Sequence, residues 1–362
     1  MPARFDAHLD LAYLAACGRD MDLDPPLAGG PDLPGAVTLK SLVEGSVGAA
    51  LATIFIEPGE GHQAVRYDPA DPASARRAAQ AQLDLYHAWE HRGLVEIGFE
   101  APASPATPLR LGVLVEGADG IGSPEELPWW AERGVRAIGL TWARSSRYAG
   151  GNAVDPDADP GLSDLGRAMV RAMDQVAIAG RTLVHDASHL SDRSLAELFE
   201  VTDAPIIASH SNCRALVGRA PLDRTAIPGE LAGRPRADQR VLQRHLTDES
   251  IVEIARRGGV VGLNLYSPFI IPGAARDRRA TLEEWVDHAD HVCQVVGHHR
   301  AVGLGSDMDG GFSAQRLPSG IDLPCDLAAL EGALARRGWT PGAIRALMWD
   351  NWASFWGLPV AP

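Results

Sequence analysis

The chain has 362 residues, of which 46% are hydrophobic and 22% are charged, a balance typical of a globular protein with a sizeable buried core. The formal net charge is −14 and no basic run offsets it, so we expect no nucleic-acid partner. The four cysteines are far apart and no apolar stretch is long enough to span a membrane. We therefore expect a cytoplasmic protein with free thiols and no membrane contact.

Short apolar runs alternate with longer amphipathic stretches along the chain. Most of the short runs are continuously apolar, as expected for parallel strands that are covered on both faces. Eight strands are predicted: Phe5–Asp10, Ala49–Ile56, Leu109–Gly117, Val135–Trp142, Thr182–Ser188, Pro205–Ser211, Gly259–Ser267 and Ala301–Asp307. Helices are predicted between them, several after a Ser or Thr of the N-cap type: Ala73–Arg92, Asp164–Ala179, Asp248–Arg257, Leu282–Val296 and Asp326–Arg337.

Eight strand–helix units in a chain of this length favour an α/β fold of the closed (β/α)8 type, a TIM-like barrel. An open, doubly wound sheet is the alternative, but no GxGxxG turn follows the first strand. We see no linker or internal repeat and expect residues 1–362 to form one domain. Long loops at residues 57–72 and 213–245 follow strands two and six, and in a barrel both lie on the catalytic face.

Residues that commonly bind metals lie where several predicted strands end. His8 and Asp10 close the first strand, and Glu116 closes the third. His189 follows the fifth strand and His210 ends the sixth, while Asp307 ends the eighth. Polar residues at the carboxyl ends of several strands are the expected layout of a barrel active site.

Each of these residues also has an ordinary structural explanation. His8-Leu9-Asp10 could be a packed histidine beside a capping aspartate, and either His189 or His210 alone could be a satisfied core histidine. Asp307 could cap a turn, because Asp-Gly sequences favour turns. Glu116 is harder to explain in this way, since a carboxylate at the end of an apolar strand is costly unless it is paired or bound to metal.

Five candidate ligands exceed the three protein groups that usually hold one catalytic zinc ion. Two ions that share a carboxylate account for the surplus, with a shared hydroxide between them as the nucleophile. Glu116 would bridge the ions, and the remaining ligands would be His8 and Asp10 on one ion and His189 and His210 on the other. A carbamylated lysine cannot be the bridge, because Lys40 is the only lysine and lies before strand two. We expect two Zn²⁺ ions or other divalent transition metals.

These residues resemble the membrane dipeptidase (renal dipeptidase) family, peptidase family M19 of the amidohydrolase superfamily. The resemblance runs through nearly the whole chain and includes Asp6–Leu11, Glu116-Gly117, Leu140-Thr141, Ser209–Asn212, Arg214–Leu216, Leu246–Glu249, Gly258–Tyr266, Gly305–Gly310 and Asp350-Asn351. It implies a distorted barrel, a dinuclear zinc site bridged by glutamate, and hydrolysis of dipeptides with little regard for the chirality of the second residue.

Carried over by position, the resemblance assigns a role to each candidate residue. The metal ligands would be His8, Asp10, Glu116, His189 and His210. Asp307 would be the acid/base that moves a proton from the attacking water to the leaving amine. Arg244, in Arg-His-Leu-Thr-Asp, matches the arginine that binds the substrate carboxylate. Trp142 and Tyr266 are further candidates for substrate contact, and His185 is the expected supporting partner of a ligand.

The sequence departs from the family pattern in two places. Trp142 stands where the family usually has a histidine that contacts the substrate, and Arg144 or Arg147 could supply the missing hydrogen-bond donor. The segment from Leu216 to Gln243 is longer than in the family, so Arg234 and Arg236 are rivals of Arg244.

Three functional hypotheses remain open. The first is a dipeptidase with a small-molecule substrate. The second is a related amidohydrolase that acts on another small amide, an N-acyl amino acid or a lactone. The third is a catalytically weak, metal-binding relative, against which the intact Asp307 counts. The sequence leaves a homodimer open.

Overall fold

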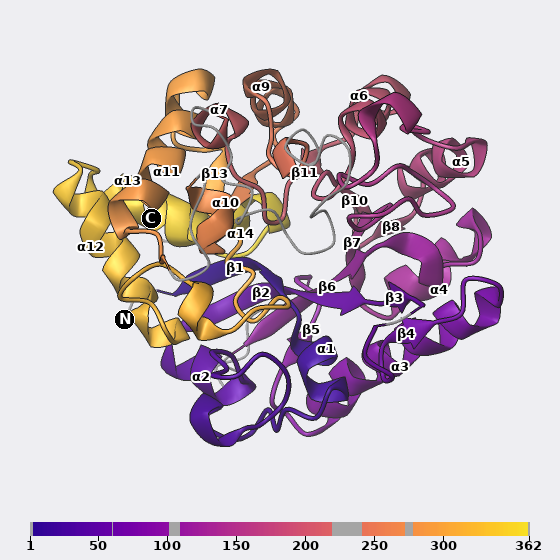
Figure 1. Ribbon diagram of the computed structural model, residues 1–362, viewed down its shortest axis with the longest axis horizontal. Helices are drawn as coiled ribbons and strands as arrows, with labels where there is room; N and C mark the ends of the chain where they lie inside the picture. The colour runs from indigo at the N-terminus through magenta and orange to yellow at the C-terminus, as the bar shows by residue number, and fades with distance from the viewer. Residues whose placement is uncertain (1–2, 60, 101–108, 219–240, 272–277, 361–362) are drawn as a thin grey trace.

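The structure, a computed structural model, describes residues 3–59, 61–100, 109–218, 241–271 and 278–360. Strands lie toward the centre of the molecule, and most of the helices lie around them (Figure 1). Among the described residues, no helix combines the length and the apolar character needed to cross a bilayer.

Each of the eight predicted strands has a counterpart in the structure. These strands are β1 (Arg4–Leu9), β2 (Val47–Phe55), β6 (Arg110–Glu116), β7 (Val135–Gly139), β10 (Val184–Asp186), β11 (Ile206–Ile207), β12 (Val261–Leu263) and β13 (Val302–Leu304). The first six pair in parallel in this order, and β12 pairs in parallel with β13. Between β2 and β6 the register is continuous from the pair Ala49–Arg110 to the pair Phe55–Glu116, so Glu116 lies level with the end of β2.

Hydrogen bonds join the ends of this strand series into a ring. The backbone N–H of Ala208 donates to the Val260 carbonyl at 3.1 Å, which connects β11 with β12. Between the last strand and the first, the N–H of Ser306 donates to Oδ1 of Asp6 at 2.8 Å, and the N–H of Asp307 donates to the His8 carbonyl at 3.2 Å. The predicted (β/α)8 barrel is thereby confirmed.

Helices follow the strands much as the sequence predicts. Their bounds are α1 (Leu11–Ala16), α2 (Leu39–Glu44), α3 (Pro72–His91), α4 (Leu127–Glu132), α5 (Asp164–Met173), α6 (Asp192–Val201), α7 (Arg214–Val217), α9 (Asp248–Arg256), α10 (Ser267–Ile270), α11 (Leu282–Val296), α12 (Ala328–Arg336), α13 (Pro341–Arg345) and α14 (Asn351–Trp356). The expected N-caps form: Ser163 Oγ accepts from the N–H of Gly166, and Thr281 and Glu284 form a capping box.

One predicted helix is wrong in its last six residues. The helix expected over Asp164–Ala179 ends at Met173, and a short antiparallel hairpin of β8 (Ala177–Ile178) and β9 (Arg181–Thr182) follows it. Ala179 and Gly180 have φ values of 51° and 83°. Positive φ at both central positions is the geometry of the two-residue turns whose twist matches a hairpin, and a helix cannot continue through it.

The two predicted long loops are only partly irregular. Residues 57–72 contain a parallel pair of short strands, β3 (Glu57–Pro58) and β4 (Arg66–Tyr67). Outside the two loops, a further short strand, β5 (Glu96–Ile97), pairs with β6. Within residues 213–245 the structure describes 213–218, which include α7, and 241–245. The remaining residues of that loop, including Arg234 and Arg236, lie outside the described residues.

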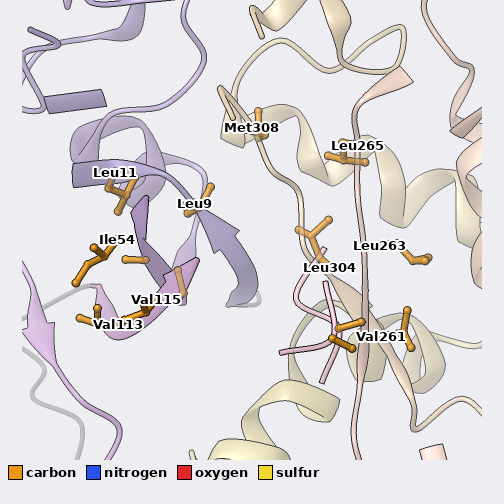
Figure 2. Packing of buried hydrophobic residues seen from close by; sticks show 14 of the residues in the cluster. Leu9, Leu11, Ile54, Val113, Val115, Val261, Leu263, Leu265, Leu304 and Met308 are labelled. Carbon is orange, nitrogen blue, oxygen red and sulfur yellow. The ribbon is translucent and has the colours of Figure 1, made fainter. Parts of the chain in front are cut away.

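Alternate residues of each strand pack into different apolar clusters, because successive side chains of a strand point to opposite faces. In β2, Ala50, Ala52 and Ile54 belong to the cluster that also contains Ala79 and Leu83 of α3. Ala49 and Leu51 belong to a second cluster with Leu114 and Ile207, inside the ring. Figure 2 shows part of the first cluster, formed by side chains from both sides of the ring: Leu9, Leu11, Ile54, Val113 and Val115 in one group and Val261, Leu263, Leu265, Leu304 and Met308 in the other.

The inner face of several strands changes from apolar to polar at the carboxyl end. Thr53 follows Leu51 on the inner face of β2, Glu116 follows Leu114 on β6, and Asp186 follows Val184 on β10. All three polar residues are buried. The carboxyl end of the barrel interior is therefore polar, and the layer of side chains beneath it is apolar.

Candidate active site

The six residues predicted from the strand ends meet at this end of the barrel. His8, Asp10, Glu116, His189, His210 and Asp307 are all buried, none with more than 8% of its surface exposed. His189 and Asp307 have φ values of 66° and 58°, a left-handed conformation that is uncommon outside glycine. Such backbone geometry is typical of functional sites, where the surrounding structure holds a residue in a fixed direction.

Glu116 lies at the centre of the cluster. Its Oε1 is 3.0 Å from Nε2 of His189 and 3.5 Å from Nε2 of His210. Its Oε2 is 3.4 Å from Nε2 of His8, which in turn lies 3.7 Å from Oδ1 of Asp10. The two oxygens of one carboxylate therefore face two different sets of side chains.

These side chains form two groups that could each hold a metal ion, and Glu116 belongs to both. The ligand atoms of His8, Asp10 and Glu116 lie within 4.8 Å of one another, as do those of Glu116, His189 and His210. A third such group consists of His8, His210 and Asp307. Imidazole nitrogens and carboxylate oxygens are ordinary ligands of zinc and similar divalent ions.

An unsatisfied buried atom supports the fit of a metal. Nε2 of His8 is buried and has no hydrogen-bond partner among the residues that the structure describes. A buried polar atom without a partner is costly, because it has lost its hydrogen bonds to water. A metal ion coordinated at Nε2 would remove this cost, so the donor set fits a divalent ion.

The electrostatics of the cluster also favour a cation. Burial opposes a charge on His8, but the attraction of Glu116, Asp10 and Asp307 outweighs it and raises the pKa of His8 to about 10. Burial is the main reason that the pKa of Asp307 is raised to about 8; the charges of Asp10 and Glu116 contribute to the rise, and those of His8 and Arg244 oppose it. Burial and the charge of Arg244 lower the pKa of His189 to about 4, which leaves its imidazole neutral.

Neighbouring polar side chains orient the candidate ligands, and the sequence did not reveal them as part of the site. Thr53 Oγ1 donates to Oδ1 of Asp10. Nδ1 of His189 lies 3.0 Å from Oδ1 of Asn152, and Asn264 Nδ2 donates to Oδ2 of Asp307 at 2.8 Å. One signal in the sequence could have identified Thr53 as part of the site. It is a polar residue two positions after Leu51, and therefore on the same face of an otherwise apolar strand.

The expected supporting role of His185 is wrong. Nε2 of His185 lies 2.8 Å from Oδ1 of Asp174, which follows α5 outside the ring. Asp186, the next residue, points inward instead, since side chains alternate along a strand. Its carboxylate accepts hydrogen bonds from Ser188 and Ser209 beside the ligand cluster.

A cavity of about 400 Å³ opens above the cluster, within the size range of small-molecule sites. The three candidate substrate-contact residues Arg244, Trp142 and Tyr266 all line it. Its aromatic lining residues are Tyr13, Phe55, Trp142, Tyr266, Phe269 and Phe312, and its charged lining residues are Asp10, Asp32, Glu57, Glu116, Arg244 and Asp307.

Arg244 is fixed within the cavity wall. Its Nη1 donates to Ser211 Oγ at 3.0 Å, its Nη2 donates to the His210 carbonyl at 2.8 Å, and its guanidinium lies over the ring of Phe269. Arg147, expected as a possible replacement for the missing donor at position 142, instead donates to the carbonyls of Asp119 and Gly122. Neither Arg144 nor Arg147 is among the described residues that line the cavity.

This fold and this cluster of donors define a metal-dependent hydrolase built on a (β/α)8 barrel. Residues 3–221 and 238–357 match the model of the membrane dipeptidase family, peptidase family M19. The chain therefore belongs to that family.

Individual relatives agree with this assignment. Dipeptidase tcpJ of Claviceps purpurea is 27% identical over 358 residues, which are 96% of this chain and 74% of the relative. A metallopeptidase from Rhodobacter sphaeroides, solved with a phosphinate mimic of the dipeptide L-Ala-D-Ala, has a TM-score of 0.76 at 23% identity, with 98% of this chain and 99% of the other covered. The probable dipeptidase PvdM from Pseudomonas aeruginosa has a TM-score of 0.75 at 21% identity, covering 98% of this chain and 95% of the other.

Proposed function

We propose that the chain hydrolyses the amide bond of dipeptides with two divalent transition-metal ions, most simply zinc. The observation that carries the proposal is the position of Glu116, whose carboxylate lies within 3.5 Å of Nε2 of His8, His189 and His210. A single carboxylate in this position serves two ligand sets at once. The dipeptidase name of the Claviceps purpurea relative and the dipeptide mimic bound to the Rhodobacter sphaeroides metallopeptidase support the choice of substrate.

Each ligand set would hold one ion. His8 and Asp10 would hold the first ion, His189 and His210 the second, and Glu116 would be shared between them. When bound, the ions would supply Lewis-acid polarisation of the scissile carbonyl and lower the pKa of water. The protein side chains supply orientation and proton transfer.

Asp307 is the proposed proton carrier. Its Oδ2 is held by Asn264, and its Oδ1 lies 3.9 Å from Nε2 of His8, facing the ligand cluster. A carboxylate at this place takes a proton from the attacking water and delivers it to the nitrogen of the leaving amine. The step conserves the proton and requires no other titratable group.

The charges that line the cavity match the two ends of a dipeptide. Arg244 donates to the carbonyl of His210, three residues beyond the end of β11, whereas Glu57 lies two residues beyond the end of β2. In a ring of eight strands, β2 and β11 are the second and the sixth members and lie opposite each other. Arg244 would bind the substrate carboxylate, and Glu57 and Asp32 would attract its ammonium group.

Trp142 favours a second candidate function. Its ring lies 5.3 Å from that of Phe55 and 6.0 Å from that of His189, so it forms an apolar wall directly beside the cluster. An indole N–H donates only one hydrogen bond and carries no positive charge. A related small amide, an N-acyl amino acid or a lactone with an apolar group would suit this wall.

A substrate panel with the zinc-loaded chain tests both candidates. L-Ala-D-Ala would be compared with its N-acetyl derivative, its C-terminal amide and an apolar N-acyl amino acid. We expect the free dipeptide to have the highest kcat/KM, because each blocked end removes a charge that the cavity complements. Faster cleavage of the N-acyl amino acid would support the second candidate, and no cleavage by a chain that holds two ions would indicate a metal-binding relative.

A further inference from the structure

Ser209, in the motif Ser209–Asn212, has no part in the proposed mechanism, yet its hydroxyl lies between two candidate ligands. The residue is fully buried. Its Oγ is 2.7 Å from Nδ1 of His210 and 3.2 Å from Nδ1 of His8. These are the ring nitrogens that point away from Glu116, and the two rings stack with their centroids 3.5 Å apart.

Asp186 fixes the direction of this hydroxyl group. Its Oδ2 accepts a hydrogen bond from Ser209 Oγ at 2.6 Å, and its Oδ1 accepts from the backbone N–H groups of Ser209 at 2.8 Å and Ser188 at 3.0 Å. With three donors directed at it, the carboxylate acts only as an acceptor. The single proton of Ser209 Oγ is therefore used toward Asp186 rather than toward Ser188 Oγ, which lies farther away at 3.3 Å. The two lone pairs of the oxygen remain for the imidazoles.

Packing holds the backbone of Ser209 in place independently of any ion. A Cβ atom added at Gly262 would lie 2.1 Å from the Ser209 carbonyl oxygen, and one at Gly305 would lie 1.8 Å from it. Both distances are far below van der Waals contact, so only glycine fits at these two positions. Ser209 is thus wedged between the strand segments that carry these glycines.

We infer that Ser209 is a positioning residue shared by both proposed metal sites, whose one hydroxyl group accepts Nδ1–H from His8 and from His210. Both histidines then present an unprotonated Nε2 toward Glu116. This inference rests on the proposed two-ion site, in which His8 and His210 belong to different ions. His189 has its own separate partner, Asn152.

The test is a titration of Zn²⁺ alone into the chelator-stripped chain, in competition with a chromophoric chelator. We expect Ser209→Ala to weaken both zinc equivalents by about 10- to 100-fold, the usual effect of removing a partner of a metal-binding histidine. Asn152→Ala is the matched control, and it should weaken only one equivalent. Ser41→Ala removes another buried serine hydroxyl, in the capping box of α2, and should leave both affinities unchanged.

The outcomes separate this inference from the proposed function. If the unmodified chain does not bind two zinc ions, the proposed function fails. If it binds two and Ser209→Ala binds both as tightly, or weakens only one, the shared role of Ser209 is overturned. Should Ser209→Ala fail to fold, Ser209→Cys keeps the volume with a weaker acceptor and carries the same expectation.

A measurement on the unmodified chain needs no variant. Two-bond ¹H–¹⁵N spectra of the zinc-loaded protein, with labelled histidine, distinguish coordination through Nε2 from coordination through Nδ1. We expect a protonated Nδ1 on both His8 and His210. Coordination of either residue through Nδ1 would also overturn the inference.

Discussion

Asn264 Nδ2 donates a hydrogen bond to Oδ2 of Asp307 across 2.8 Å, which leaves Oδ1 of that carboxylate facing His8. The carboxylate is also confined by the chain that follows it. A Cβ atom at Gly310 would lie 1.8 Å from Oδ1 of Asp307, so any larger residue there would displace the carboxylate. The side chain that we propose as the proton carrier is therefore fixed in direction before any substrate binds.

Asp307→Asn should retain the metal ions and lose turnover. The substituted amide has the size and shape of the carboxylate but cannot accept and release a proton at neutral pH. We expect kcat to fall by about 10²- to 10⁴-fold. Metal content, measured on the same preparation, is the control, and wild-type activity in a fully loaded variant would assign proton transfer to another group.

Trp142→His should change the substrate preference. Imidazole can donate a hydrogen bond to developing negative charge on the substrate, and such a donor contributes about 10²- to 10³-fold to the rate. If dipeptides are the substrates, kcat for L-Ala-D-Ala should rise. Trp142→Phe keeps an apolar ring and provides the control, and an equal response of both variants would show that ring size rather than hydrogen bonding matters.

Arg244→Ala should raise KM for substrates with a free carboxylate by about 10- to 100-fold, the loss expected for charged hydrogen bonds. The C-terminal amide of the same dipeptide should respond much less. Arg147→Ala is the matched control, because the Arg147 guanidinium bonds to Asp119 and Gly122 rather than lining the cavity. An equal rise in KM for the acid and the amide would place carboxylate recognition elsewhere.

Metal removal should lower the thermal stability as well as the activity. Elemental analysis of the chain purified without chelator should find close to two transition-metal ions. Each occupied site held at a 1,000-fold excess over its Kd adds about 4 kcal/mol to the free energy of unfolding, because the unfolded chain lacks the assembled site. A melting temperature that is the same with and without chelator, in a chain shown to contain metal, would contradict this expectation.

Arg19→Met should destabilise the fold without touching the metal ligands. Arg19 and Asp309 form an ion pair with no exposed side-chain surface, and Asp309 Oδ2 also accepts from the N–H groups of Ala36 and Val37 at 2.7 Å each. Removing one partner leaves a buried charge, at a cost of about 3–5 kcal/mol. Arg92→Met breaks the exposed pair with Asp22 and should cost at most about 1 kcal/mol, as urea unfolding of both variants would show.

The barrel was predictable because buried parallel strands have a simple pattern. Their continuous apolar runs identify them, and a ligand-type residue at a strand end, such as Glu116, stands out against its apolar neighbours. The amphipathic spacing that predicts helices was less reliable at Ala179. There the helical spacing of α5 continues in the sequence, but the chain forms a turn with positive φ. A helix-forming residue in that conformation has no sequence signal, since the hairpin of β8 and β9 imposes it.

The supporting groups of the site were less accessible to prediction. Thr53 resembles any β-branched strand residue until the register places it beside Asp10. His185 and Asp186 differ by one position, which decides whether a side chain points into the ring or toward α5. Such choices depend on strand register and loop geometry, and these are properties of the assembled barrel rather than of a local segment.

The joint between the first and last strands, where Asp6 receives Ser306 and His8 receives Asp307, has a consequence for folding. Ser306 and Asp6 are 300 residues apart in the sequence, so their hydrogen bond closes a very long loop. Contacts of such long range cost loop-closure entropy and slow folding. We therefore expect refolding chains to acquire zinc affinity only after most of their helical structure has formed, when the ring of strands closes.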